Sequence, residues 1–174
     1  GLEEWDFFLT NGNDSGYSVV TQNSTLRLEI DRNNTWVYFV NNQIEMADVR
    51  IDTSVENLGR NNNNVSLICR YNDRGWYEFN IANNGIYSIL RYNSSSEQYT
   101  ALFSGGSRAI RTGLDTNEYI AVCSGEDLTL YINGVETRTV SDRQFDTGLA
   151  GLSVSSFDVT PIISEIDYVT FSIP

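Results

Sequence analysis

The segment from Val65 to Tyr92 carries the pattern that most restricts how this chain can fold. Three runs that alternate apolar and polar residues are separated by two short turn segments, Asn72–Gly75 and Asn83–Gly85. Asn, Asp and Gly tolerate the positive φ angles that tight β-hairpins require. We therefore expect three consecutive antiparallel strands joined by two hairpin turns.

Other parts of the chain repeat this pattern. Apolar runs and turns alternate again between Ala121 and Val140, and residues 46–55 alternate strictly, so that every second side chain there can face a core. Further strands are expected at residues 26–30, 35–40, 99–103, 149–154 and 162–171. Regularly spaced short strands with polar turns are typical of an antiparallel β-sandwich.

The length of 174 residues suits one core. The prediction is an all-β, two-sheet antiparallel sandwich of about a dozen strands, as a single domain over residues 1–174. The longest connection, residues 104–115, is a candidate ligand-binding loop at one end of the sandwich.

Two groups of motifs resemble a known fold family. They are ICRYND, WYEFNI and NGIYSI within residues 68–89, and CSGEDLTLYINGVE at residues 123–136. Both resemble the concanavalin A-like (laminin G-like) jelly-roll superfamily, and most of all its 3-keto-disaccharide hydrolase-like extracytoplasmic domains. The resemblance implies a jelly-roll sandwich outside the cytoplasm that binds carbohydrate or acts on sugars.

Charge and composition exclude several classes of function. The net charge is −12 and the chain contains neither Lys nor His. Nucleic acid and insertion into a membrane are therefore not expected, because there is neither a basic cluster nor a long apolar segment. A Ser-His-Asp mechanism and a His-ligated zinc site are excluded within the chain. We expect a secreted or cell-surface protein, since the acidic, Asn-rich and Lys-free composition is compatible with export. No leader segment is visible, so a processed chain is expected.

Two cysteines lie within expected strands. Cys69 alternates in phase with Val65 and Leu67, and Cys123 alternates in phase with Ala121, so both side chains should face the core. Tyr71 is expected to continue the core-facing set of Cys69. An even number of cysteines in an exported protein favours a disulfide between them. The alternative is a pair of buried free thiols that act as small apolar groups.

The polar and aromatic residues of the central strands predict a carbohydrate-binding face. Aromatic rings stack on sugar rings, and planar polar groups bond to pairs of hydroxyl groups. Alternation places Arg70 opposite in sense to Cys69, so that Arg70, Glu78 and Arg91 should share one solvated surface. The predicted ligand-binding residues are Arg70, Trp76, Glu78, Asn80, Tyr87 and Arg91. The alternative is a surface of cross-strand ion pairs without a ligand.

Carboxylate pairs suggest an alternative function as a sugar-active enzyme. A glycosidase needs two carboxyl groups about 5 to 9 Å apart. Glu78 could be paired with Asp73, or with Asp48 and Asp52. A chain with 23 acidic residues will contain such pairs by chance, so this signal is weak.

A structural calcium ion is a further prediction. The resemblance implies a site between an N-terminal loop and the last strand, with Asp6, Asp14 and Asp167 as ligands. The segment Asn11–Gly16 has the spacing of a calcium-binding turn, although Asn and Ser replace most of its acidic residues. The alternative is an Asn-rich turn that bonds to its own backbone.

A different class of function is a structural or adhesive subunit that assembles with itself. Trp36–Val40 is apolar or aromatic at every position. If one face of this strand is bare, it marks an interface, and unpaired edge strands could join copies of the chain. The segment Asn61–Asn64 is expected to be an exposed polar loop without a recognition role.

Overall fold

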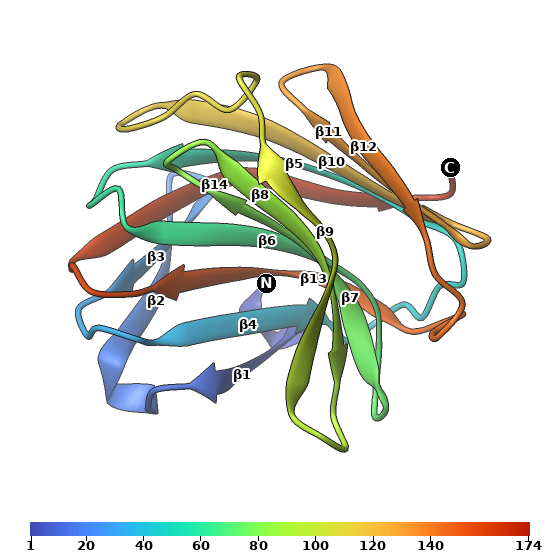
Figure 1. Cartoon of the computed structure of the whole chain (residues 1–174). Coiled ribbons are helices and arrows are strands. Elements are labelled where there is room, and N and C mark those ends of the chain that lie inside the picture. The colour runs from blue at the N-terminus through green and yellow to red at the C-terminus, as the bar shows by residue number, and fades with distance from the viewer.

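The computed structural model describes residues 1–174, which form two antiparallel seven-stranded sheets packed face to face (Figure 1). Sheet A has the order β1-β4-β13-β6-β7-β8-β9, with the bounds β1 Trp5–Asn11, β4 Trp36–Asn41, β13 Leu149–Ser156, β6 Asn63–Asn72, β7 Gly75–Ala82, β8 Ile86–Asn93 and β9 Gln98–Gly106. Sheet B has the order β12-β11-β10-β5-β14-β3-β2, with the bounds β12 Val135–Ser141, β11 Asp127–Ile132, β10 Thr116–Ser124, β5 Val49–Asn57, β14 Ile162–Ser172, β3 Thr25–Ile30 and β2 Tyr17–Gln22. The predicted all-β sandwich is confirmed.

The only helical segments are two 3-10 turns, Leu2–Glu4 and Asp14–Gly16. Neither is of a length or hydrophobicity that would span a membrane.

The core lies between the sheets and follows from alternation along the strands. Leu67 on β6 and Phe79 on β7 point inward from sheet A, and Ile51 on β5 and Leu130 on β11 point inward from sheet B, each 0% exposed. These residues belong to one cluster of 28 buried side chains. A period of two in the sequence thus gives each sheet one face that is covered by the other sheet.

A disulfide joins the two sheets. Cys69 on β6 is bonded to Cys123 on β10, 54 residues further along the chain. Both side chains are completely buried in the core. The disulfide predicted from the sequence is confirmed, and no free cysteine is left.

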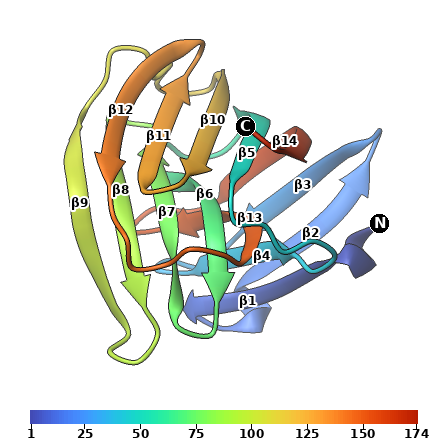
Figure 2. The same cartoon turned by 90° about the vertical axis from the view of Figure 1, so that its right-hand side faces the viewer.

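Sheet A is strongly twisted and curled. In a flat sheet of seven strands, six spacings of about 4.8 Å would hold the edge strands about 29 Å apart. Instead, the hydroxyl of Thr10 on β1 lies 3.3 Å from the hydroxyl of Tyr99 on β9. Figure 1 shows β8 and β9 running steeply across the direction of β4, β13 and β6, and Figure 2 shows the tip of the β8–β9 hairpin coming down beside the end of β1. The outer face of sheet A is therefore a concave surface.

A β-bulge at Arg70 changes which side chains face outward at the end of β6, so the alternation predicted there is wrong. The pairing of β6 with β7 shifts register between Cys69 and Asn72, and Arg70 has a φ of 54°. An extra residue in one strand rotates the side chains that follow it. Tyr71 consequently packs on the outer face of sheet A, beside Trp76, and not in the core with Cys69.

The strand Trp36–Asn41 is internal to sheet A, between β1 and β13. Val37 and Phe39 enter the core, and Tyr38 and Val40 are 2% and 1% exposed. The run Trp36–Val40 therefore does not offer the bare face that an assembly interface would need. Self-association through the edge strands stays a prediction.

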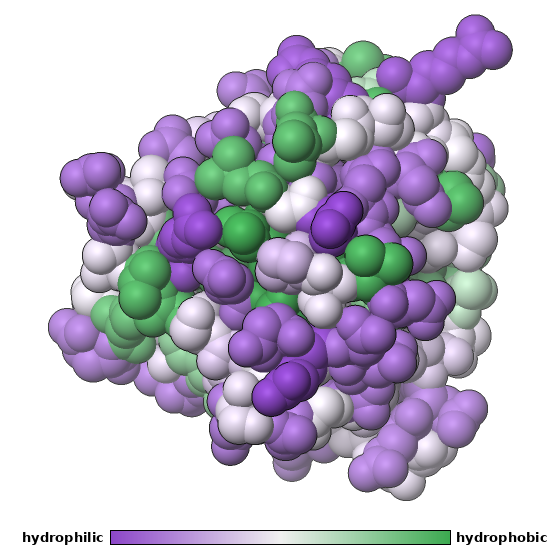
Figure 3. All heavy atoms as spheres, turned by 90° about the vertical axis from the view of Figure 1, so that its left-hand side faces the viewer, coloured by the Kyte–Doolittle hydropathy of each residue, from purple (hydrophilic) through white to green (hydrophobic).

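The end of the sandwich at which β13 turns into β14 is built from Asn-rich loops. Asn62 accepts a hydrogen bond from the backbone N–H of Asp158, Asn61 accepts one from Gly113, and Asn63 is buried within β6. The prediction that Asn61–Asn64 is only an exposed loop is wrong, because these side chains hold neighbouring loops in place. Figure 3 shows this end as hydrophilic surface with small, separate hydrophobic areas.

Candidate functional site

Aromatic side chains gather on the concave face of sheet A. They form a hydrophobic cluster separate from the core, around the buried residues Tyr38, Ile68 and Trp76. Tyr92 stacks on Trp76 with ring centroids 4.1 Å apart, and Tyr99 lies 4.7 Å from Tyr92. We call this set the aromatic face; its members are Phe8, Trp36, Tyr38, Tyr71, Trp76, Tyr92 and Tyr99.

A buried carboxylate lies at the centre of the aromatic face. Glu78 on β7 is 2% exposed. Its two oxygens accept hydrogen bonds from Ser66 Oγ at 2.8 Å, Tyr38 Oη at 3.0 Å, Trp76 Nε1 at 3.2 Å and Asn80 Nδ2 at 3.4 Å. Four donors from three strands therefore surround one carboxylate. An arrangement of this kind fixes the rotamer of each donor.

Burial raises the pKa of the Glu78 carboxyl above its ordinary value, because desolvation disfavours the charged form. The hydrogen bonds from Ser66, Trp76 and Tyr38 act in the opposite direction and lower it by a smaller amount. The pKa of Tyr38 is raised well above 10, by burial first and by the charge of Glu78 second. Burial is therefore the main cause of the raised pKa of both the Glu78 carboxyl and the Tyr38 hydroxyl.

Two hollows open on the aromatic face. The smaller, which we call the small pocket, has a volume of about 140 Å³ and is lined by Trp36, Tyr38, Asn64, Glu78, Asn80, Leu90, Tyr99, Ser155 and Phe157. The larger, which we call the basin, has a volume of about 740 Å³ and is lined by Phe8, Leu9, Thr10, Trp36, Tyr71, Trp76, Tyr92, Ser94, Glu97, Gln98 and Tyr99. Ligand sites are typically hollows of this kind, mainly apolar with a few polar groups.

Two buried polar atoms on this side of sheet A have no partner within the chain. They are the indole Nε1 of Trp36 and the hydroxyl of Ser153, which pairs in register with Tyr38 and Ser66. An indole N–H that is removed from water usually finds an acceptor. The ring of Trp36 lines both hollows, while its N–H is buried without an acceptor.

Three of the six predicted ligand-binding residues come together on this face. Trp76, Glu78 and Asn80 follow one another at every second position of β7 and point to the same side. The prediction that Glu78 lies on a solvated surface is wrong, however, because the β8–β9 hairpin and the surrounding rings cover it.

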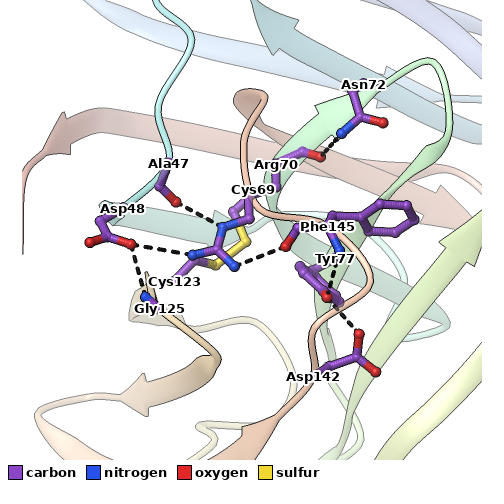
Figure 4. The surroundings of a disulfide bond; sticks show 10 residues. All are labelled: Ala47, Asp48, Cys69, Arg70, Asn72, Tyr77, Cys123, Gly125, Asp142 and Phe145. Carbon is purple, nitrogen blue, oxygen red and sulfur yellow. Dashed lines mark hydrogen bonds and ion pairs between the residues drawn. A yellow bond between two sulfur atoms is a disulfide. The ribbon is translucent and has the colours of Figure 1, made fainter.

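Arg70 lies elsewhere, as Figure 4 shows beside the disulfide. The bulge turns its side chain inward, where it is 2% exposed. Its guanidinium donates to the carbonyl of Ala47 at 2.8 Å, to the carbonyl of Phe145 at 3.0 Å and to Asp48 at 3.3 Å. Arg70 thus binds two loops together, and its predicted place on a solvated face with Glu78 is wrong.

Tyr87 and Arg91 on β8 also lie away from the aromatic face. Tyr87 is 3% exposed and belongs to the core between the sheets. In the β7–β8 pairing, Tyr87 lies opposite Ile81 and Arg91 lies opposite Tyr77, so alternation along β8 places both on the inner side of sheet A, where Arg91 donates to Asp142 at 2.6 Å. Tyr77 donates to the same carboxylate, and burial raises the pKa of its hydroxyl to about 12. This cluster ties the loop after β12 to sheet A, and Figure 4 shows its bond between Tyr77 and Asp142.

The predicted carboxylate pairs are not assembled. Asp52 lies on β5 in sheet B and pairs with Arg50 at 2.8 Å, and Asp48 pairs with Arg70. The core separates both of them from the outer face of sheet A, where Glu78 lies. Asp73 is exposed in the β6–β7 turn. Glu78 therefore has none of these acids as a partner.

The three aspartates predicted to bind calcium do not form one group of ligands. Asp6 on β1 accepts a hydrogen bond from Asn42 at 2.8 Å, and Asp167 is exposed on β14 in sheet B. Asp14 lies in the 3-10 turn, which Asn13 caps by accepting from the N–H of Ser15. The Asn-rich turn that bonds to its own backbone is the alternative that the structure favours.

Several residues of the site were missed in the sequence. Tyr38 and Ser66 lie opposite Glu78 only because β4 and β6 are placed in sheet A, and Tyr99 reaches the site from the edge strand β9. Strand alternation identifies outward-facing side chains, but it does not reveal which distant strands are neighbours. The one available signal was the run Trp36–Val40, because a strand that is apolar or aromatic at every position can be covered on both faces.

The comparisons with solved structures agree on the fold. A carbohydrate-binding module, CBM66 from Bacillus subtilis, superposes with a TM-score of 0.69 and 13% identity, covering 95% of this chain and 94% of that one. The exoplasmic/lumenal domain of VIP36, bound to Ca2+ and Man3GlcNAc, superposes with a TM-score of 0.64 and 15% identity, covering 100% of this chain and 85% of that one. A glycoside hydrolase family 16 endo-glucanase from Bacteroides ovatus superposes with a TM-score of 0.67 and 11% identity, covering 99% of this chain and 96% of that one.

The chain has a concanavalin A-like jelly-roll fold. The fold-level resemblance seen in the motifs of β6, β7 and β11 is thus confirmed, whereas the closer resemblance to 3-keto-disaccharide hydrolase-like domains stays a prediction. No protein-family model matches the sequence, and no curated protein matches it. Because the similar structures include both binding modules and hydrolases, they identify the fold and not the activity.

Proposed function

We propose that this protein is a non-catalytic module that binds carbohydrate on the aromatic face of sheet A. The observation that carries the proposal is the basin, where six aromatic side chains line one open hollow beside Ser94 and Gln98. Flat rings cover the apolar faces of a sugar ring, and the polar groups at the rim bond to its hydroxyls. A carbohydrate-binding module and a lectin domain with the same fold support this reading.

The ligand class that fits this surface is an uncharged glycan. Neither hollow is lined by a basic residue, and both include one acidic side chain, Glu78 or Glu97. The chain as a whole carries a net charge of −12. Sulfated or uronic acid-rich glycans would be repelled, because like charges at short range disfavour binding.

A role in orienting the side chains of the aromatic face fits Glu78 better than a catalytic role. Both of its oxygens already accept hydrogen bonds from within the chain, which leaves no position for a substrate oxygen at this carboxylate. A glycosidase also needs a second carboxyl about 5 to 9 Å away. Among the residues that line the hollows, the other acid is Glu97, which is exposed in the β8–β9 turn.

We further propose that the module acts outside the cytoplasm, in a secreted or cell-surface protein. The buried disulfide between Cys69 and Cys123 supports this location, because such bonds persist in oxidising compartments. The lumenal lectin domain among the similar structures also supports it.

The proposal is tested on a glycan array of neutral and acidic oligosaccharides, followed by assays for hydrolysis of every glycan that binds. We expect saturable binding of at least one neutral glycan, no binding of sulfated ones and no release of shorter products. Hydrolysis that is lost in Glu78→Gln would replace the proposal with a sugar-active enzyme. An array without any binding by the folded protein would overturn it and favour the assembly hypothesis.

A further inference from the structure

Tyr99 closes a hydrogen-bonded bridge across the aromatic face. Its hydroxyl lies 2.7 Å from the hydroxyl of Tyr38 and 3.3 Å from that of Thr10. Tyr38 in turn donates to Glu78 at 3.0 Å. The bridge therefore links the edge strands β1 and β9 to the interior strands β4 and β7 of the same sheet.

Glu78 gives this bridge a fixed direction. An ionised carboxylate only accepts hydrogen bonds, and each hydroxyl carries a single proton. Tyr38 must then donate to Glu78 and accept from Tyr99, and Tyr99 must accept from Thr10. A chain of hydroxyls with one consistent direction is stronger than its separate bonds, since each bond polarises the next. Tyr99 is thus held firmly in its position.

The position of Tyr99 is between the two hollows. Trp36 and Tyr99 are the residues that line both the small pocket and the basin. Their rings meet edge to face, with centroids 6.3 Å apart. The side chain of Tyr99, bonded to Tyr38 and packed against Trp36, therefore borders both hollows on the concave face, and we call it the wall.

The small pocket is of a size for one ring. Its volume of about 140 Å³ is close to the cavity of about 150 Å³ that is known to enclose a benzene molecule. The basin is about 740 Å³, within the usual range of roughly 300 to 1,000 Å³ for ligand sites. An extended glycan could pass from one hollow to the other only if the wall were absent.

We propose that Tyr99 determines specificity by restricting the aromatic face to the ends of neutral glycan chains. This inference rests on the proposed function. The wall stops a polysaccharide from lying along the whole face, so a terminal segment binds on one side of Tyr99. Removal of the side chain would join the two hollows into one groove that accepts internal segments.

The test counts how many protein molecules bind each polysaccharide chain. The probes are linear mixed-linkage β-glucan, mannan and levan in fractions of known chain length, each with its tetrasaccharide, in titration calorimetry. We expect the wild type to bind a single site per chain, and to bind each polymer chain and its tetrasaccharide with similar affinity. Sulfated dextran serves as the acidic comparison.

Three substitutions of Tyr99 distinguish the effect of its ring, which forms the wall, from the effect of its hydroxyl group. Tyr99→Ala removes the wall. Tyr99→Leu removes the hydroxyl and the outer part of the ring but keeps apolar packing against Tyr92. Tyr99→Phe removes the hydroxyl and keeps the ring. We expect the Tyr99→Ala and Tyr99→Leu variants to bind at many sites along each polysaccharide chain, with about a tenfold gain in affinity for the polymer. Phe should retain a single site per chain. Tyr168→Ala, an exposed tyrosine on sheet B, is the matched control and should bind as the wild type does.

The outcomes distinguish this inference from the proposed function. Wild-type binding at many sites per chain would overturn the role of Tyr99 and leave carbohydrate binding intact. A single site per chain in both Ala and Leu variants, with circular dichroism showing at least one of them folded, would also overturn it. If the folded wild type binds a neutral glycan on the array but none of the polymers and tetrasaccharides, the role of Tyr99 is overturned and carbohydrate binding stands; if the array is also blank, both proposals fail.

Discussion

At the scale of single residues, Glu78 acts through the groups that it orients. It is the common acceptor for Ser66, Trp76 and Tyr38, and each of these side chains belongs to a different strand. Removing a buried acceptor leaves its donors unpaired, at a cost of about 1–3 kcal/mol for each. We therefore regard Glu78 as the residue that holds the aromatic face in its shape.

The raised pKa of Glu78 predicts how stability depends on pH. A carboxyl whose pKa is higher in the folded state binds more protons there than in the unfolded chain. Its contribution to the free energy of unfolding is therefore greatest at low pH and decreases as the pH rises from the ordinary value of 4.5 toward the raised one. Glu78→Gln removes this titration.

Urea unfolding of wild type and Glu78→Gln between pH 4 and pH 8 checks this. We expect the stability of the wild type relative to the variant to fall as the pH rises. A difference that is constant would mean that the surrounding donors balance burial at Glu78, and one that grows with pH would mean that they outweigh it.

Arg70 is a structural residue, and this yields a second prediction. Arg70→Met keeps the apolar stem but leaves the buried carbonyls of Ala47 and Phe145 without donors. We expect the free energy of unfolding to fall by about 2–4 kcal/mol. Affinity for the glycan found on the array should be unchanged at a temperature where the variant is folded. Unchanged stability with lost affinity would restore Arg70 to the binding site.

At the scale of elements, sequence alternation accounts for most of the strands and for three of the six predicted site residues. It found β5, β6 and β7, and it put Trp76, Glu78 and Asn80 on one side. It failed at Arg70, because a bulge there reverses which side chains face outward, and on β8, where the pairing places Tyr87 opposite Ile81 and Arg91 opposite Tyr77. Only the pairing between strands reveals the bulge and the relative facing of neighbouring strands.

The link between the sheets gives a prediction at the same scale. The disulfide of Cys69 with Cys123 closes a loop of about 54 residues, so its loss should reduce the free energy of unfolding by about 4 kcal/mol. The double variant Cys69→Ala/Cys123→Ala is compared with the wild type in urea. Adding a reductant should bring the unfolding midpoint of the wild type toward that of the variant and leave the variant itself unaffected. A loss below about 1 kcal/mol would show that the core alone fixes the two sheets.

At the scale of the whole molecule, the curl of sheet A creates the site. The aromatic face exists because β9 bends over the sheet until Tyr99 meets Thr10 on the opposite edge. No local pattern in the sequence indicates this long-range contact, whereas the two-sheet architecture follows from periodicity and turn chemistry alone.

The distribution of acids predicts that the fold does not depend on calcium. Because Asp6, Asp14 and Asp167 do not form one group of ligands, calcium has no differential affinity for the folded chain at these residues. The midpoint of thermal unfolding should change by less than about 1 °C between excess calcium and EDTA. A marked rise with calcium would reveal a site built from other oxygens.

The central claim, that the aromatic face binds neutral glycans, is tested most directly by calorimetric titration of Trp36→Ala and Tyr168→Ala with a glycan that the wild type binds. Trp36 lines both hollows, whereas Tyr168 is exposed on the opposite sheet. We predict that Trp36→Ala weakens binding by about tenfold or more, equivalent to about 1.4 kcal/mol, and that Tyr168→Ala binds as the wild type does. Equal affinity in wild type and Trp36→Ala, both shown to be folded, would contradict the claim.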